Sequence, residues 1–272
     1  MNILAADSSS TLAFLRGHIA TLERGRTADM PAMLASGHAA LDAALGGGLL
    51  KGRLHELFGA NVEDSGSSAG FALLLGLLAG QGGLPMLWLR TNKAEKIGGH
   101  LYGPGLAALG FDPAMLLLGV MQDETMLLRA ASDALRCAGL AAVVIECWGN
   151  PSVLDLTASR RLALAAEGSG VIALLLRLDA QPAPSAAETR WRIASAPSID
   201  PLGERLMGPS AFDLELLRRR AGPDGLRWRL EWNRDRRCFE DPGQAALSGA
   251  LASLPVAGPA TDRATGYVEA AA

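Results

Sequence analysis

The sequence predicts an α/β fold with a mainly parallel sheet that is covered by helices on both faces. Five short apolar runs of strand length alternate with segments long enough to form helices, and the runs span residues 54–58, 86–89, 115–120, 142–147 and 171–176. Strands that are apolar at successive positions are typical of parallel sheets buried on both faces. The intervening helices are clearest at residues 71–80, 124–138 and 153–166.

Composition excludes several classes of protein. The chain has 272 residues, 49% of them hydrophobic, and a net charge of -3, so the whole molecule does not attract nucleic acid or acidic lipid. Its three cysteines are widely spaced and its histidines lack metal-ligand spacing, so no disulfide framework and no metal site are expected. The start of the chain lacks the pattern of a signal peptide, and no apolar run is long enough to span a membrane. We therefore expect a soluble, cytoplasmic protein.

The N-terminal segment, residues 1–35, is predicted to be a helix followed by a linker. Serines at 8–10 can cap the helix, and an apolar stripe follows at Leu12, Leu15, Ile19 and Leu22. Two interpretations remain open for this stripe. It packs on its own domain, or it docks on a neighbouring subunit.

The core domain is predicted to cover residues 36–242. Its last third contains "TRWRIASA", "FDLELLRRR" and "LRWRLEW", which we expect to extend the sheet as antiparallel strands. In the last of these, tryptophan and leucine alternate with charged residues, as a half-buried strand requires. Residues 243–272 are rich in alanine, glycine and proline without periodicity, and they are predicted to be a disordered tail.

The stretch "GANVEDSGSSAG" lies between a strand and a helix, where a nucleotide phosphate loop would lie. Gly59 and Gly66 can be the two glycines of such a loop, but six residues separate them instead of four. Ser67 stands where the phosphate-binding lysine belongs, and Ser68 stands at the hydroxyl position that holds magnesium. Glu63 and Asp64 add negative charge to the loop. Taken alone, the stretch also fits an ordinary turn between a strand and a helix.

The surrounding sequence resembles a RecA-type core. "GHAALDAALGGGLLKGRLHELFG" is similar to the segment that leads into the phosphate-loop strand of RecA proteins. It resembles still more closely the ImuA family, the RecA-like accessory proteins of bacterial damage-induced mutagenesis. "ETRWRIASAPS", "FDLELLRRRAG" and "RWRLEWNRDRRCFEDP" follow in the order found in that family. The resemblance covers residues 36–242 and implies a RecA-like P-loop NTPase-type core.

The resemblance also implies that the catalytic site is degenerate. The phosphate-loop lysine of active RecA proteins falls on Ser67, and the carboxylate that activates water falls at about Asn92. The magnesium-side aspartate falls on Glu146, and the nucleotide-sensing glutamine falls near Arg177 or Leu178. Phosphoryl transfer depends on placed charge and metal. We therefore expect no ATP hydrolysis, no catalytic residue and no cofactor.

Arginines concentrate near the end of the core and form a candidate partner interface. The interface candidates are Arg218, Arg219, Arg220, Arg227 and Arg229. Such a cluster fits either a binding surface or a solvated sheet edge, where charge discourages strand pairing. The two loops that hold single-stranded DNA in RecA proteins correspond here to residues 148–154 and to "DAQPAPSAAE", and they supply few cations. Direct DNA binding and the oligomeric state are left open.

The resemblance to the ImuA family implies partners in a translesion synthesis complex. The partners to expect from it are the inactive Y-family-like protein ImuB, an error-prone DnaE-type polymerase and RecA. The function that follows is a non-catalytic RecA-like adaptor induced by the SOS response. Two alternatives remain: a nucleotide-switched ATPase with a divergent loop, and a cell-division inhibitor of the SulA type.

Overall fold

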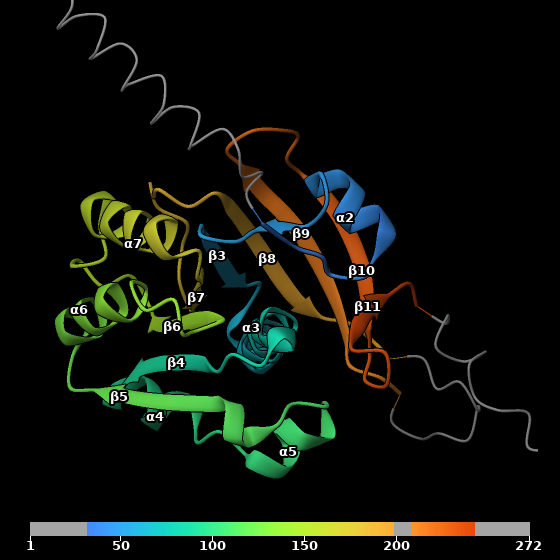
Figure 1. Ribbon diagram of the computed structural model, residues 1–272, viewed down its shortest axis with the longest axis horizontal. Helices are drawn as coiled ribbons and strands as arrows, with labels where there is room; N and C mark the ends of the chain where they lie inside the picture. Colours follow the sequence, from blue (N-terminus) through green and yellow to red (C-terminus); the bar gives the residue numbers. More distant parts are fainter. Residues whose placement is uncertain (1–31, 199–207, 243–272) are drawn as a thin grey trace, which may run out of the picture.

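A nine-stranded sheet forms the centre of the molecule (Figure 1). The computed structural model describes residues 32–198 and 208–242. In chain order the strands are β3 Leu54–Gly59, β4 Met86–Thr91, β5 Leu116–Met121, β6 Ala142–Trp148, β7 Ile172–Leu178, β8 Thr189–Ser195, β9 Ala211–Arg219, β10 Leu226–Asn233 and β11 Cys238–Glu240. Across the sheet their order is β11-β10-β9-β8-β3-β7-β6-β4-β5. The strands from β8 to β5 are parallel, while β9, β10 and β11 pair antiparallel.

Helices cover both faces of the parallel part, as the alternating pattern predicts. Helices α6 (Glu124–Ala134) and α7 (Leu156–Ser169) lie side by side on one face, and α3 (Ser65–Ala79) lies on the other (Figure 1). Aspartates define where two of them begin: Asp123 accepts a hydrogen bond from the amide of Met126, and Asp155 accepts one from that of Ala158. The shorter helices are α2 Ala39–Leu45, α4 Asn92–Gly98 and α5 Gly103–Ala108.

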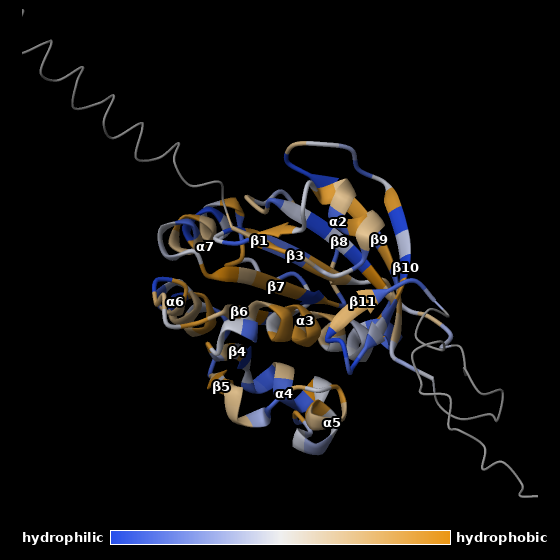
Figure 2. Cartoon of the chain, turned by 45° about the vertical axis from the view of Figure 1, so that its right-hand side comes forward, coloured by the Kyte–Doolittle hydropathy of each residue, from blue (hydrophilic) through white to orange (hydrophobic). Residues whose placement is uncertain are grey.

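Helix α3 is enclosed on nearly all sides. Its residues from Phe71 to Ala79 are all buried, because the sheet covers one side and the curled antiparallel strands cover the other. The ring of Phe71 contacts those of Phe212 and Phe239, with centroid distances of 5.5 and 5.2 Å. Gly76 allows β4 to approach, since a Cβ there would lie 1.9 Å from the sulfur of Met86. Figure 2 shows how apolar residues concentrate in α3 and the central strands.

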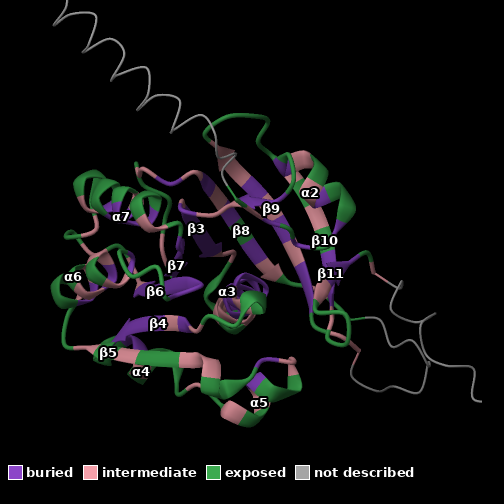
Figure 3. Cartoon of the chain, in the orientation of Figure 1, coloured by how far each residue is buried: buried purple, intermediate pink, exposed green. Residues whose placement is uncertain are grey.

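Burial falls from the centre of the sheet to its edge (Figure 3). Strand β7 is buried along its whole length, so successive residues pack alternately against α3 and against the α6–α7 layer. The edge strand β5 is only partly covered, and Leu117 and Leu118 are exposed there. Among the described residues, no helix is both long enough and apolar enough to cross a membrane.

Three local expectations differ from the structure. Strand β8, from "TRWRIASA", pairs parallel to β3, so only the strands after it are antiparallel. Helix α3 begins at Ser65 instead of residue 71. A short strand, β1 (Met33–Leu34), occupies the expected linker and pairs with β2 (Leu49–Leu50). The N-terminal stripe and the C-terminal tail lie outside the described residues.

Candidate functional site

The loop between β3 and α3 is fastened to the end of β8 by its own acidic residue. A short 3-10 helix, Val62–Asp64, occupies the middle of the loop. The buried carboxylate of Asp64 accepts hydrogen bonds from the amide and the hydroxyl of Ser195, both 2.8 Å long, and from Asn61. The amide of Ala60 donates to the carbonyl of Ile193 at 2.8 Å. The sequence suggested that Asp64 adds negative charge to an open phosphate loop, but its carboxylate is bonded to β8 instead. Glu63 is exposed.

The residues predicted to form the phosphate loop lie together, between the end of β3 and the first turn of α3. Gly59 ends β3, and a Cβ there would lie 3.3 Å from the hydroxyl of Ser68. Gly66 and Ser67 belong to the first turn of α3. Ser68 is buried, and its hydroxyl donates to the carbonyl of Asp64 at 2.8 Å. The hydroxyl expected at the magnesium position thus donates to the backbone of its own helix.

Glu146, at the end of β6, is held by three nitrogen donors. One carboxylate oxygen accepts from the indole of Trp148 at 2.8 Å and from Arg90 at 3.1 Å. The other accepts from the indole of Trp88 at 2.8 Å. The side chains of Glu146 and Arg90 are 4% and 3% exposed, so the ion pair is buried. A carboxylate bonded in this way is a structural anchor, because a magnesium ion would have to displace a buried guanidinium.

Helix α4 closes over this ion pair. Arg90 also donates to the carbonyls of Ala94 and Gly99, at the two ends of the helix. A Cβ on Gly98 would lie 3.1 Å from the guanidinium of Arg90 and 3.5 Å from Glu146. Asn92, expected at the position of the catalytic base, is exposed at the first turn of α4. The described residues contain no group of three or more His, Cys, Asp or Glu side chains placed to hold a metal ion.

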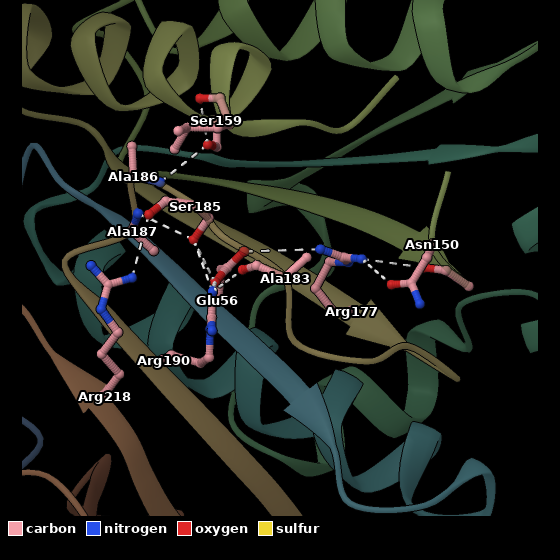
Figure 4. Close-up of polar contacts among 12 residues, drawn as sticks. Glu56, Asn150, Ser159, Arg177, Ala183, Ser185, Ala186, Ala187, Arg190 and Arg218 are labelled. Carbon is pink, nitrogen blue, oxygen red and sulfur yellow. Dashed lines mark hydrogen bonds and ion pairs between the residues drawn. The ribbon is translucent and has the colours of Figure 1, made fainter. Parts of the chain in front are cut away.

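A second buried charge cluster lies on the opposite face of the sheet (Figure 4). Glu56 of β3 accepts hydrogen bonds from Arg190 of β8 and from the hydroxyl of Ser185, both 2.8 Å long. Arg177 of β7 lies 3.9 Å from the same carboxylate. The guanidiniums of both arginines stack over the ring of Phe58, at 5.4 and 5.7 Å from its centroid. The single carboxylate of Glu56 faces two guanidiniums. The electron-rich face of the Phe58 ring attracts them as well and so supplements the carboxylate.

The cluster holds the loops that follow β6 and β7. Arg177 donates to the side chain of Asn150 at 2.8 Å, and Arg190 donates to the carbonyl of Ala183. The hydroxyl of Ser159 on α7 accepts from the amide of Ala186. Burial lowers the pKa of Arg177, while Cys147 and Glu56 oppose that change. This cluster was not predicted from the sequence. The feature that could have indicated it is a charged residue inside each of two apolar strands, Glu56 in "LHELF" and Arg177 in "ALLLRL".

The candidate interface arginines have different roles. Arg219 donates to the carbonyls of Ala44 and Leu45 and thereby caps the C-terminal end of α2. Arg229 forms a two-bond pair with Asp213, and Arg227 pairs with Glu215, whose pKa is lowered mainly by that hydrogen bond. Arg218 donates to the carbonyl of Ser185. Arg219 therefore uses two of its donors inside the fold, and its role at a partner interface stays a prediction.

Arginines and acids also line a hollow on the antiparallel part of the sheet. Its volume is about 660 Å³, and it is lined by residues of β8, β9 and β10, including Arg192, Asp213, Glu215, Arg227 and Arg229. The side chains of Arg227 and Arg229 are 74% and 50% exposed. This face can therefore meet a partner.

Asp64 gives the loop a dependence on pH. Burial alone would raise the pKa of this carboxyl, but hydrogen bonds from Ser195 and Asn61 outweigh it and lower the pKa from 3.8. A carboxyl with a lowered folded-state pKa stabilises the fold above its unfolded pKa, and this contribution is lost as the pH falls through the folded value. We expect Asp64→Ala to lower the free energy of unfolding by about 1.5–3 kcal/mol at neutral pH.

The measurement for Asp64 is urea denaturation at several pH values. The difference between wild type and Asp64→Ala should narrow as the pH falls below 3.8. Glu63→Ala is the matched control, since the neighbouring Glu63 is exposed and its loss should change stability little at any pH. A constant difference between wild type and Asp64→Ala would show that the charge of Asp64 does not fasten the loop.

Comparison with known proteins identifies the family. The chain is 35% identical over 218 residues to the protein named Protein ImuA from Caulobacter vibrioides strain NA1000 / CB15N, and equally to that from strain ATCC 19089 / CIP 103742 / CB 15. The match covers 75% of this chain and 85% of each relative. The chain belongs to the ImuA family. No family model matches it.

The fold of this ImuA-family chain is RecA-like. A crystal structure of the RadB recombinase matches it with a TM-score of 0.54 and 20% sequence identity, over 77% of this chain and 99% of that one. At that identity the likeness shows the fold alone. The predicted RecA-like core and the ImuA resemblance are both confirmed, while the catalytic inactivity and the partners remain predictions.

Proposed function

We propose that this chain is a non-catalytic, RecA-like adaptor of an SOS-induced translesion synthesis complex. Its partners on this proposal are ImuB, the error-prone DnaE-type polymerase and RecA. Membership of the ImuA family supports this role. The observation that carries the non-catalytic part is the buried ion pair of Glu146 with Arg90, at 3.1 Å, in the place of a magnesium-side carboxylate.

Charge at the loop supports the same proposal. Ser67 supplies no positive charge for a polyphosphate, and Ser68 is fully buried. Nucleotide-binding loops of this type rely on a lysine and on a neighbouring hydroxyl whose oxygen can reach a magnesium ion. The loop keeps its connection between β3 and α3, and it is stabilised by Asp64 in place of a bound phosphate.

Nucleotide binding by the purified full chain tests the proposal. We expect no ATP turnover and no thermal shift with millimolar ATP and magnesium. The variant Ser67→Lys should not restore binding, because Glu146 stays paired with Arg90. Micromolar affinity of the wild-type chain for ATP would contradict the proposal and favour a nucleotide-switched ATPase.

Partner binding requires a separate experiment. A tagged full chain should co-purify with ImuB and the polymerase from DNA-damaged cells. Replacing Arg227 and Arg229 by alanine should reduce that recovery, since these exposed arginines line the hollow of β8, β9 and β10, the charged sheet face. Replacing Arg136 and Arg160, which are exposed on the α6–α7 side and do not line its groove, removes the same charge and serves as control. Equal recovery of both variants would exclude the charged sheet face, and recovery of the cell-division tubulin homologue alone would favour the SulA-type alternative.

A further inference from the structure

A groove between α6 and α7 is open to solvent on the outer side of the helical layer. Its volume is about 380 Å³, and its apolar lining comprises Leu128, Val153, Ala158 and Leu162. Val153 is 42% exposed, whereas Leu162 is buried at the bottom. A groove with an apolar floor between two helices is suited to the apolar side chains of a third helix.

The rim of the groove is charged and polar. Arg129, Asp133 and Arg161 line it together with Thr125 and Ser132. All three charged side chains belong to exposed residues. Asp133 already pairs with Arg136 at 3.1 Å, so the rim mainly offers two arginines, and an occupant with a carboxylate beside its apolar stripe would match the rim as well as the floor.

The described part of the chain begins next to this helical layer. The carbonyl of Ala32 accepts a hydrogen bond from the amide of Lys51, which precedes Gly52. Gly52 lies against the C-terminal end of α7, because a Cβ there would be 3.2 Å from the Cα of Gly170. Arg53 pairs with Glu167 of α7 at 2.9 Å. The preceding residues therefore leave the core beside α7.

Residues 11–24 have the length and pattern that the groove requires. As a helix they would present Leu12, Leu15, Ile19 and Leu22 on one side, flanked by Arg16, Glu23 and Arg24. Fourteen helical residues span about 21 Å, the length of α7. Residues 25–31 can bridge at most about 25 Å, enough to reach any position along α7.

We propose that residues 11–24 dock as an amphipathic helix in the α6–α7 groove of their own chain. The apolar stripe covers Leu128, Val153 and Leu162, and the carboxylate of Glu23 beside the stripe meets the rim arginines, Arg129 and Arg161. This docking is independent of the adaptor role and of partner identity. It assigns the stripe to an intramolecular contact.

The experiment uses full-length variants and two readouts. Leu15→Arg with Ile19→Arg disrupts the stripe, while Ala13→Arg with Ala20→Arg adds the same charge to the opposite side of the helix. The readouts are cleavage after Glu23 by a glutamate-specific protease, for which the arginine variants create no new site, and amide hydrogen exchange in α6 and α7. We expect the stripe variant to speed cleavage about tenfold, which corresponds to about 1.4 kcal/mol of lost docking. The control should behave as wild type.

Groove variants test the same contact from the other side. Val153→Arg should release the segment as the stripe variant does, and it should not unfold the core, because Val153 is already exposed. Leu164→Arg on α7 is the matched control, since Leu164 is 68% exposed and does not line the groove. Equal cleavage of wild type, stripe variant and Val153→Arg would overturn the proposal.

Light scattering distinguishes docking within one chain from docking between two. The proposal requires cleavage rates that do not change when the protein is diluted, and a stripe variant with the same molar mass as wild type. A wild-type dimer that the stripe variant converts to a monomer would overturn the proposal in favour of exchange between subunits. Neither readout depends on nucleotide binding, so the adaptor proposal can fail while this one stands.

Discussion

Replacing Glu146 by alanine is expected to lower the free energy of unfolding by about 3–5 kcal/mol. The substitution leaves the buried guanidinium of Arg90 without its carboxylate, and it removes the acceptor of the indoles of Trp88 and Trp148. An unpaired charge in a buried site costs more than the net contribution of the intact pair, because the charge has lost its hydration. Chemical denaturation of wild type and variant measures the difference.

A conservative variant separates charge from hydrogen bonding at this position. Glu146→Gln keeps an oxygen acceptor but removes the negative charge. We therefore expect its free energy of unfolding to lie between that of wild type and that of Glu146→Ala. Glu95→Ala on α4 is the control, because its partner His100 is 85% exposed and surface pairs contribute about 0–1 kcal/mol. A loss below about 1 kcal/mol for Glu146→Ala would contradict the structural role and would leave Glu146 available as a metal ligand.

Replacing Glu56 by alanine is expected to destabilise the fold by about 3 kcal/mol and to release the loop after β7. Glu56 is 2% exposed, and its removal leaves Arg177 and Arg190 beside each other without an anion. Arg190 is 12% exposed, so water can reach part of its charge, and we place the effect at the lower end for a broken buried pair. Hydrogen exchange should accelerate in residues 183–190, which this cluster fastens to the sheet.

A surface glutamate provides the matched control for Glu56. Glu167→Ala also removes a carboxylate that pairs with arginine, but its side chain is 53% exposed and that of Arg53 is 31% exposed. We expect a loss of less than about 1 kcal/mol and unchanged exchange in residues 183–190. An equal loss of stability in Glu56→Ala and Glu167→Ala would show that the buried Glu56 cluster does not fasten the loop after β7 more strongly than a surface ion pair.

On our proposal, the two clusters stabilise a RecA-like core that binds no nucleotide. Glu146 and Arg90 stabilise one face of the sheet, and Glu56 with two arginines stabilises the other. Glu146 lies near the carboxyl end of β6, the side on which ligands bind in open α/β sheets, whereas Glu56 lies in the middle of β3. On our proposal, contacts within the protein replace those that a bound nucleotide and metal supply elsewhere.

The positions of the parallel strands were predictable from the sequence. Continuous apolar runs such as "ALLLRL" are compatible with strands buried on both faces, and all five runs became strands within one or two residues. The absence of lysine from the loop between β3 and α3 was also evident from the sequence, which has Ser67 at the position expected for lysine. These features are local, so the sequence by itself determined them.

Long-range pairing was decided only by the tertiary structure. An alternating strand looks the same whether its neighbour runs parallel or antiparallel, and β8 pairs with β3 across 134 residues, as His55 and Thr189 show. Likewise, Glu146 and Arg90 lie 56 residues apart, and no local pattern shows which charges will meet. The sequence therefore determined that the loop between β3 and α3 contains no lysine, whereas only the packing of distant strands decided that buried arginines engage Glu56 and Glu146.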